Sequence, residues 1–127
     1  MKDILVALIP LAFLITGCGK QNSIIKAHNQ MVAVESSMVD FINSAGNAGE
    51  QAAAVETALN SIQKIDVSEC PHDYQVAWQE VIQTWKKLAT ALKNRDIVLA
   101  EQLIKESPVK TSTLNRIAQS HGVQMAD

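Results

Sequence analysis

Proline and glycine are scarce in this sequence, with three prolines and five glycines in 127 residues. Because these residues punctuate chains that are built from many short strands, their scarcity favours long helices. Basic residues are also too few to outnumber the acidic ones, and the formal net charge is -2. A chain without a positive field does not attract a phosphate backbone, so we expect no nucleic-acid partner.

The sequence also lacks the short motifs that mark common active sites. It has no phosphate-binding loop, no dinucleotide fingerprint and no nucleophile elbow around any serine. Its acidic residues fall mostly on the polar faces of the predicted helices, not as pairs in an apolar setting. We therefore expect a protein that is not an enzyme.

The first part of the chain has the three regions of a secretory signal. Lys2 follows the amino terminus, residues 4–15 form an apolar run interrupted only by Pro10, and Thr16 and Gly17 are small. A helix needs about 20 apolar residues to span a bilayer, and this run is well short of that length. We therefore expect the segment to be cleaved off and not to remain as a transmembrane anchor.

The five residues from Leu14 to Cys18 resemble the lipobox of bacterial lipoproteins. The resemblance implies that the chain is cut before Cys18, that the thiol carries a diacylglyceryl group, and that palmitate or a similar acyl chain is attached. Two or more such chains hold a protein stably on a membrane. Gly19 stands where an aspartate would imply retention at the inner membrane, so an outer-membrane position facing the periplasm is expected. An ordinary cleaved signal followed by an unrelated cysteine is the alternative.

The expected division is a signal peptide over 1–17, a lipidated cysteine with a short tether over 18–23, and a helical domain over 24–127. Asn22 or Ser23 should cap the first helix, which is predicted to end at 44. Apolar residues recur along it in two series with a spacing of seven, as in a helix packed against antiparallel partners. The two series are Ile24, Met31, Met38 and Ala45, and Ala27, Val34 and Phe41.

Two further helices follow. Asn47 and Glu50 have the spacing of a capping box and predict the start of the second helix, which should end near 64–66. Pro71 suits the first turn of the third helix, which should stop at Asn94. The third helix carries the strongest apolar stripe: Tyr74, Trp78, Val81, Trp85, Leu88 and Leu92. We interpret this stripe as core and not as an exposed platform for a ligand.

The fourth helix should begin after Asp96 with an apolar face that includes Ile97 and Ile104. We expect it to break at Pro108, because proline lacks an N–H and clashes with the preceding turn. A last segment over 112–121 should end at Gly122. The predicted fold is all-α, an antiparallel up-down four-helix bundle with the fourth helix broken at Pro108. Its layout resembles small periplasmic four-helix bundles, including the b-type bundle cytochromes.

Cys70 stands before Pro71 and His72 at the start of the third helix. A cysteine at a helix N-terminus can have a lowered pKa and react as a thiolate. Because Cys18 is expected to carry lipid, Cys70 has no partner in its own chain. Three interpretations stay open for it: a small buried residue at the end of the bundle, an intermolecular disulfide, and redox or metal chemistry.

The candidates for holding a metal or haem are His28, Met31, Cys70, His72 and His121. They show none of the close pairings that mark zinc sites. His28 and Met31 lie one turn apart, which suits copper, and the likeness to bundle cytochromes implies Met31 and His121 as haem ligands. These residue types are more often core or surface residues, so we expect no cofactor and no metal.

The sequence therefore favours a membrane-anchored, non-enzymatic module that binds a protein or another envelope component. A second apolar series, Ile25, Val32 and Val39, recurs every seven residues along the first helix. It either meets a partner helix or a homodimer mate, or belongs to a wide core face. A small periplasmic haem- or metal-binding bundle and an immunity or inhibitor lipoprotein are the alternatives.

Overall fold

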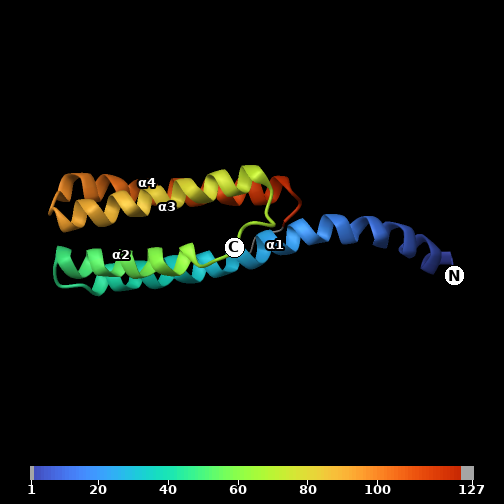
Figure 1. The fold of residues 1–127 in the computed structure, drawn as a ribbon, viewed down its shortest axis with the longest axis horizontal. Helices are drawn as coiled ribbons and strands as arrows, with labels where there is room; N and C mark the ends of the chain where they lie inside the picture. The colour runs from blue at the N-terminus through green and yellow to red at the C-terminus, as the bar shows by residue number, and fades with distance from the viewer. Residues whose placement is uncertain (1, 124–127) are drawn as a thin grey trace.

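The computed structural model describes the backbone of residues 2–123 and the side chains of residues 21–123. The helices are α1 (Lys2–Ser44), α2 (Ala48–Gln63), α3 (His72–Lys93) and α4 (Ile97–Ser120). Within residues 2–123 there is no strand, which confirms the prediction of an all-helical chain with four helices. Figure 1 shows α1 beside α2 and α3 beside α4, with the amino-terminal part of α1 projecting past the other helices.

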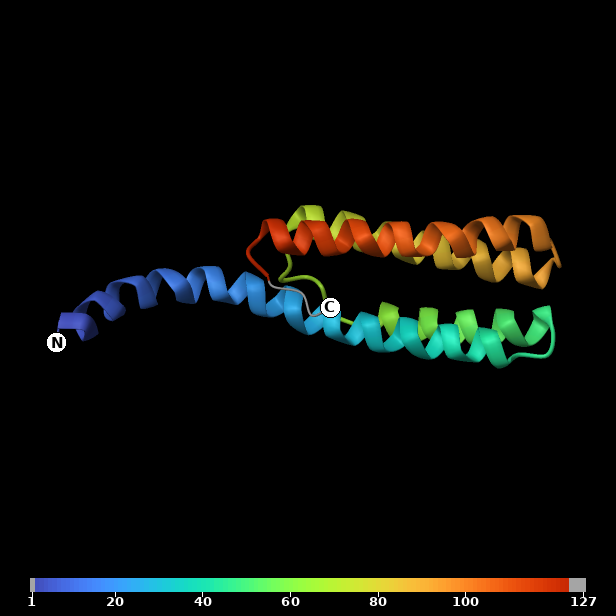
Figure 2. The same ribbon diagram turned by 180° about the vertical axis from the view of Figure 1, so that it is seen from behind.

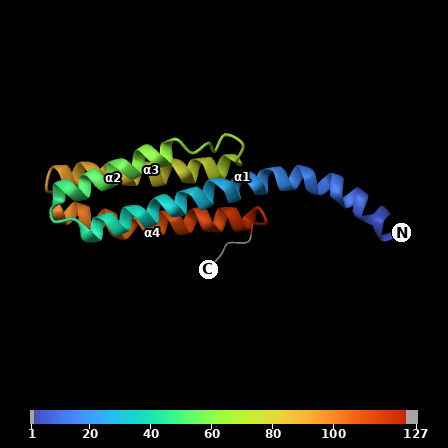
Figure 3. The ribbon, with the colours of Figure 1, turned by 90° about the horizontal axis from the view of Figure 1, so that it is seen from below.

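Each helix packs on the next one in the chain: α1 on α2, α2 on α3, and α3 on α4. The pairs α1–α2 and α3–α4 form two layers, as the views from opposite sides show (Figures 1 and 2). The connections after α1 and α3 lie at one end, which we call the distal end. The connection after α2 and the end of α4 lie at the other, proximal end, where α1 leaves the bundle (Figures 1 and 3).

The first helix begins earlier than predicted. We expected a start at Ser23 with a cap at Asn22 or Ser23, but α1 runs without interruption from Lys2. The apolar run over 4–15 continues the helix, and the glycines that follow it cost only about 1 kcal/mol each relative to alanine. The tether expected over 18–23 is therefore helical in the uncut chain. A capping residue acts only where a helix begins, and α1 does not begin at Asn22 or Ser23.

One residue of the predicted core seam on α1 is exposed. The series Ile24, Met31 and Met38 is buried as predicted, but Phe41 is 62% exposed. The neighbouring Ile42 is instead half-buried against the core. A straight α-helix has 3.6 residues per turn, so its buried stripe drifts by about 20° for each seven residues. Over the two heptads from Ala27 to Phe41 the drift reaches about 40°, which moves the buried position from Phe41 to Ile42.

The helix starts within the bundle are capped as the sequence predicts. The side chain of Asn47 accepts a hydrogen bond from the Glu50 amide at 2.9 Å, and that of Asp96 accepts from the Leu99 amide at 3.2 Å. Asn94 ends α3, and the following Arg95 has a φ of 57°. Gly122, with a φ of 88°, ends α4 in the left-handed conformation that glycine adopts without cost.

The aromatic stripe of α3 lies in the core. Tyr74, Trp78 and Trp85 are each at most 1% exposed, and the Tyr74 and Trp78 rings lie with their centroids 5.9 Å apart. Large buried aromatic rings dominate the packing energy of a small domain. The interpretation of this stripe as core is therefore confirmed, and the stripe offers no ligand platform.

The predicted break at Pro108 is not found, because α4 continues through it from Ile97 to Ser120. An internal proline costs a helix about 3 kcal/mol. On either side of it, Leu103 and Leu114 are buried. Burying one leucine contributes about 1.5–3 kcal/mol, so packing of both halves on α3 outweighs the local cost.

Two residues of the expected apolar face of the fourth helix are not in the core. Ile97 is 48% exposed and Ile104 is 42% exposed. The first lies at the distal end, where no further helix covers it. The second borders a groove that is described below. Within the described part of the chain, no helix has an apolar stretch long enough to cross a membrane.

Candidate functional site

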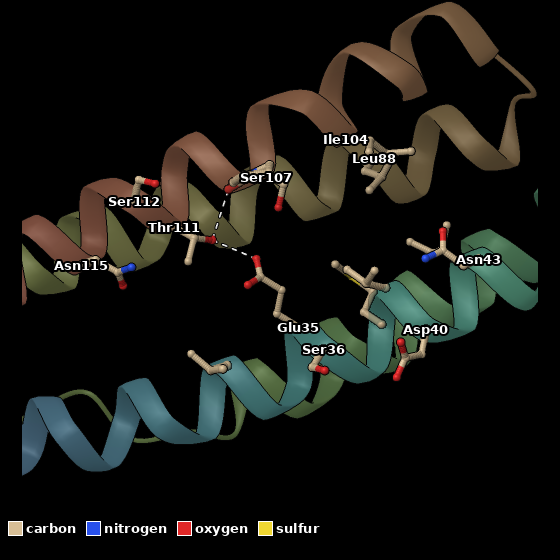
Figure 4. Close-up of a pocket in the computed structure, with 15 residues that line it drawn as sticks. Glu35, Ser36, Asp40, Asn43, Leu88, Ile104, Ser107, Thr111, Ser112 and Asn115 are labelled. Atoms are coloured by element: carbon tan, nitrogen blue, oxygen red, sulfur yellow. Dashed lines mark hydrogen bonds between the residues drawn. The ribbon is translucent and has the colours of Figure 1, made fainter. Parts of the chain in front are cut away.

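A groove of about 570 Å³ runs between α1 and α4. Residues from Val32 to Asn43 of α1 and from Ile104 to Asn115 of α4 form its two walls, and Leu88 of α3 completes the lining. Each wall spans eleven residue steps of a helix, which is about 16 Å. Figure 4 shows the two walls facing each other with Glu35 reaching across. The volume is in the range of pockets that hold small organic molecules.

The walls of the groove are mostly apolar and accessible. Val32 and Val39 on α1 are 43% and 45% exposed, and both line the groove, as does Ile104 on α4. These two valines belong to the second apolar series that the sequence showed, and Ile25 of the same series is 40% exposed. The interpretation of this series as part of a wide core face is therefore wrong. An apolar surface that stays accessible between two helices is typical of a binding site.

Glu35 is the half-buried one of the two acidic residues that line the groove. The Thr111 hydroxyl donates to its Oε2 atom at 2.9 Å and also lies 3.2 Å from the Ser107 carbonyl oxygen. Ser107 in turn accepts a hydrogen bond from Nε1 of the buried Trp85 at 3.0 Å through its hydroxyl. This network joins α1, α3 and α4 across the floor of the groove, and Figure 4 shows its part from Glu35 through Thr111 to Ser107.

The protonation of Glu35 is set by its surroundings. Burial raises the pKa of this carboxyl, and the hydrogen bond from Thr111 opposes that effect only in part. A threonine hydroxyl has one proton to donate. The Ser107 carbonyl also has the Thr111 amide as its partner in the helix ladder, so the hydroxyl proton is available to the Glu35 carboxylate.

One side-chain oxygen among the residues that line the groove has no hydrogen-bond partner. The Oδ1 atom of Asn115 is buried and makes no hydrogen bond. Asn115 follows Thr111 by four residues on α4, so the two side chains are neighbours on one face of the helix. A buried polar atom without a partner costs about 1–3 kcal/mol.

The proximal end holds two of the three histidines in separate contacts. His28 on α1 is 5% exposed, and its Nδ1 atom lies 3.3 Å from the Tyr74 hydroxyl. His121 Nε2 lies 3.0 Å from Asp73 Oδ1, and its backbone carbonyl accepts from the Gln21 side chain at 3.0 Å. These contacts fasten α1, α3 and the end of α4 to one another.

The candidate metal and haem ligands do not come together. Among the described residues, no group of three or more His, Cys, Asp or Glu side chains is placed to hold a metal ion. Gln21 touches His121, whereas Met31 is ten residues further along α1, about 15 Å away along the helix axis. Met31 is fully buried and His72 is exposed. The structure therefore does not bring together Met31 and His121, the haem ligands that the likeness to bundle cytochromes implied.

Cys70 is a buried residue and not an activated nucleophile. It is 5% exposed, and burial together with the nearby Asp66 raises the pKa of its thiol. A raised pKa disfavours the thiolate, which is the reactive form. The interpretation as a small buried residue at the end of the bundle is confirmed, and the thiolate interpretation is wrong. The side chain of Cys18 lies outside the described residues.

Burial also lowers the pKa of His28, which predicts acid sensitivity. The unfolded chain takes up a proton at this residue near pH 6.5, before the folded chain does. The neutral His28 therefore makes its full contribution to the free energy of unfolding above that pH. This contribution is lost as the pH falls below it. We expect the wild type to lose more unfolding free energy than His28→Gln between about pH 7.5 and pH 5. Urea unfolding at both pH values measures this difference.

The exposed His72 provides the matched control for this experiment. His72→Gln removes an imidazole that lies in solvent near the start of α3. It should follow the wild-type pH dependence. An identical dependence for His28→Gln and the wild type would contradict the prediction.

The sequence pointed to one wall of the groove but missed its polar groups. Val32 and Val39 were singled out as a second apolar series, whereas Glu35, Thr111 and Asn115 were not noticed. The available signal was the position of Glu35, directly after the core residue Val34 on the inner side of α1, and the spacing of four between Thr111 and Asn115.

Comparisons of the chain with models of known protein families, with curated protein sequences and with solved structures found no match.

Proposed function

We propose that this protein is a lipid-anchored, non-enzymatic binding module of the bacterial cell envelope, and that its binding site is the groove between α1 and α4. The observation that carries the binding proposal is the accessible apolar groove with Val32, Val39 and Ile104 on its walls. No paired catalytic groups accompany Glu35 in the lining, which favours binding over catalysis.

The anchoring part of the proposal rests on the leader sequence and on the position of Cys18. The segment from Leu14 to Cys18 resembles a lipobox, and Gly19 favours the outer membrane, facing the periplasm. Among the side chains that the structure describes, the first buried core residue is Ile24, six residues after Cys18. A cut before Cys18 would therefore remove only the part of α1 that precedes the core. The proximal end of the bundle would then lie close to the bilayer.

The bundle topology that accompanies this proposal is antiparallel and up-down. Its support is the short connections between helices that pack on their chain neighbours. In this arrangement α1 and α4 are the first and last helices, so no connecting loop holds them against each other. The groove then lies between the first and the last helix of the bundle.

Photo-crosslinking in intact envelopes tests the binding site. A diazirine amino acid at position 39 should form adducts, because Val39 is on the groove wall. The same amino acid at position 76 is the matched control, because Val76 is also a valine of similar exposure, 47% against 45%, but does not line the groove. Ile104→Asp, on the opposite wall, should remove the adducts from position 39. Equal adducts from both positions, or none from position 39, would reject the groove as the site.

A further inference from the structure

The charges that line the groove are of one sign. Glu35 and Asp40 carry its two carboxyl groups, and no lysine, arginine or histidine is among its lining residues. The nearby Lys110 is engaged elsewhere, with its Nζ atom 3.2 Å from Oε1 of Glu80. A molecule that enters the groove therefore meets a negative potential that no lining cation compensates. This favours a cationic ligand over an anionic one.

The groove is also polar at one end and apolar at the other. Glu35, Thr111 and Asn115 lie toward the proximal end, where Figure 4 shows the Glu35 carboxylate turned to Thr111. Toward the distal end, four aliphatic side chains line the groove together with Asp40 and Asn43. The aliphatic ones are Val39, Ile42, Leu88 and Ile104. An occupant that matches both ends has a polar head and an apolar body along an axis of about 16 Å.

The acidic group at the polar end is a hydrogen-bond acceptor. The Glu35 carboxylate accepts from the Thr111 hydroxyl through Oε2 and can accept further donors. An ammonium group has three donors and no acceptor, so it can donate to this carboxylate and compensate its charge. A hydroxyl offers only one donor, and a carboxylate offers none and repels Glu35.

From these observations we infer that the groove binds a small amphipathic amine, with its ammonium group on Glu35 and its apolar chain toward Leu88 and Ile104. This inference rests on the proposed function, because it names the ligand class of the same groove. Hydrogen bonds to a charged group contribute more than neutral ones. The ammonium should therefore give at least a tenfold preference over a neutral head on the same chain.

The test compares three probes with one chain and different heads: hexylamine, hexanol and hexanoate. The full chain is placed in lipid nanodiscs, and empty nanodiscs correct for uptake by lipid. Methyl NMR signals of Val32, Val39 and Ile104 report binding, since these side chains line the groove. We expect hexylamine to shift them at concentrations at least tenfold lower than hexanol, and hexanoate to bind most weakly. Hexylamine should also lower the pKa of Glu35, followed through its carboxyl carbon signal.

Glu35→Gln should remove the preference for the amine while hexanol binds as before. Glu101→Gln is the matched control, because it deletes the same charge from an exposed position of α4 outside the groove. Equal affinity for the three probes, no shift of the groove methyls, or an unchanged preference in Glu35→Gln would each overturn the inference. Groove signals that move with protein concentration instead would show a second copy as occupant and would also overturn it. The crosslinks from position 39 are independent of this result, so the two proposals fail separately.

Discussion

Replacing Trp85 with alanine is expected to lower the free energy of unfolding by about 3–5 kcal/mol, the cost of removing a fully buried tryptophan ring. Trp85 has no exposed surface, and its Nε1 atom donates to the Ser107 hydroxyl at 3.0 Å. The loss is large because domains of this size are stable by only about 5–15 kcal/mol. Urea unfolding followed by circular dichroism measures it. The floor of the groove should become more mobile as well, because Ser107 lines it and loses its hydrogen-bond donor.

Two further variants separate the parts of this effect. Trp85→Phe keeps most of the apolar volume but removes the donor to Ser107, so we expect a smaller loss of about 1–3 kcal/mol. Val98→Ala truncates a side chain that is 79% exposed and should change stability by less than about 0.5 kcal/mol. If Trp85→Ala unfolded at the same urea concentration as Val98→Ala, the position of Trp85 in the core would be contradicted.

Replacing Cys18 with serine is expected to abolish lipid attachment completely. The proposed anchor depends on one sulfur atom, and serine lacks the thiol that receives the glycerolipid. Grown with labelled palmitate, cells should show label in the wild-type protein and none in Cys18→Ser. The variant should keep residues 1–17, which intact mass measurement detects, and should no longer be held on the membrane by acyl chains.

The other cysteine of the chain supplies the control for this experiment. Cys70→Ser also exchanges a thiol for a hydroxyl, but at a buried position between α2 and α3. Label per amount of protein should equal that of the wild type. Label that persists in Cys18→Ser, or a wild-type protein that takes up no palmitate, would disprove lipidation at Cys18.

Local sequence signals predicted the starts and ends of most helices. Asn47 and Asp96 act as caps because a short polar side chain next to an amide satisfies it without help from distant residues. Gly122 ends α4 for an equally local reason, its positive φ. The stripe of α3 was predictable because spacings of three and four place Tyr74 and Trp85 on the same face of any helix.

The errors fell where local signals competed with packing or with geometry accumulated over many residues. Pro108 signals a break, but Leu103 and Leu114 hold the two halves of α4 on α3. Phe41 fits a repeat of seven, but two repeats after Ala27 a straight helix has turned this position away from the core. Neither outcome can be read from the neighbouring residues, because each depends on where another helix lies.

The sequence alone determined that the chain forms four helices, where α2 and α4 are capped and which face of α3 is buried. These properties depend on contacts within a few residues, so their signals are present in the order of the amino acids. Only the tertiary structure decided that α1 and α4 leave a groove, that Glu35 meets Thr111 in it, and that Asn115 keeps an unpaired oxygen. Glu35 and Thr111 are 76 residues apart, and the chemistry of such a pair exists only once packing has fixed the distance between the two helices that carry it.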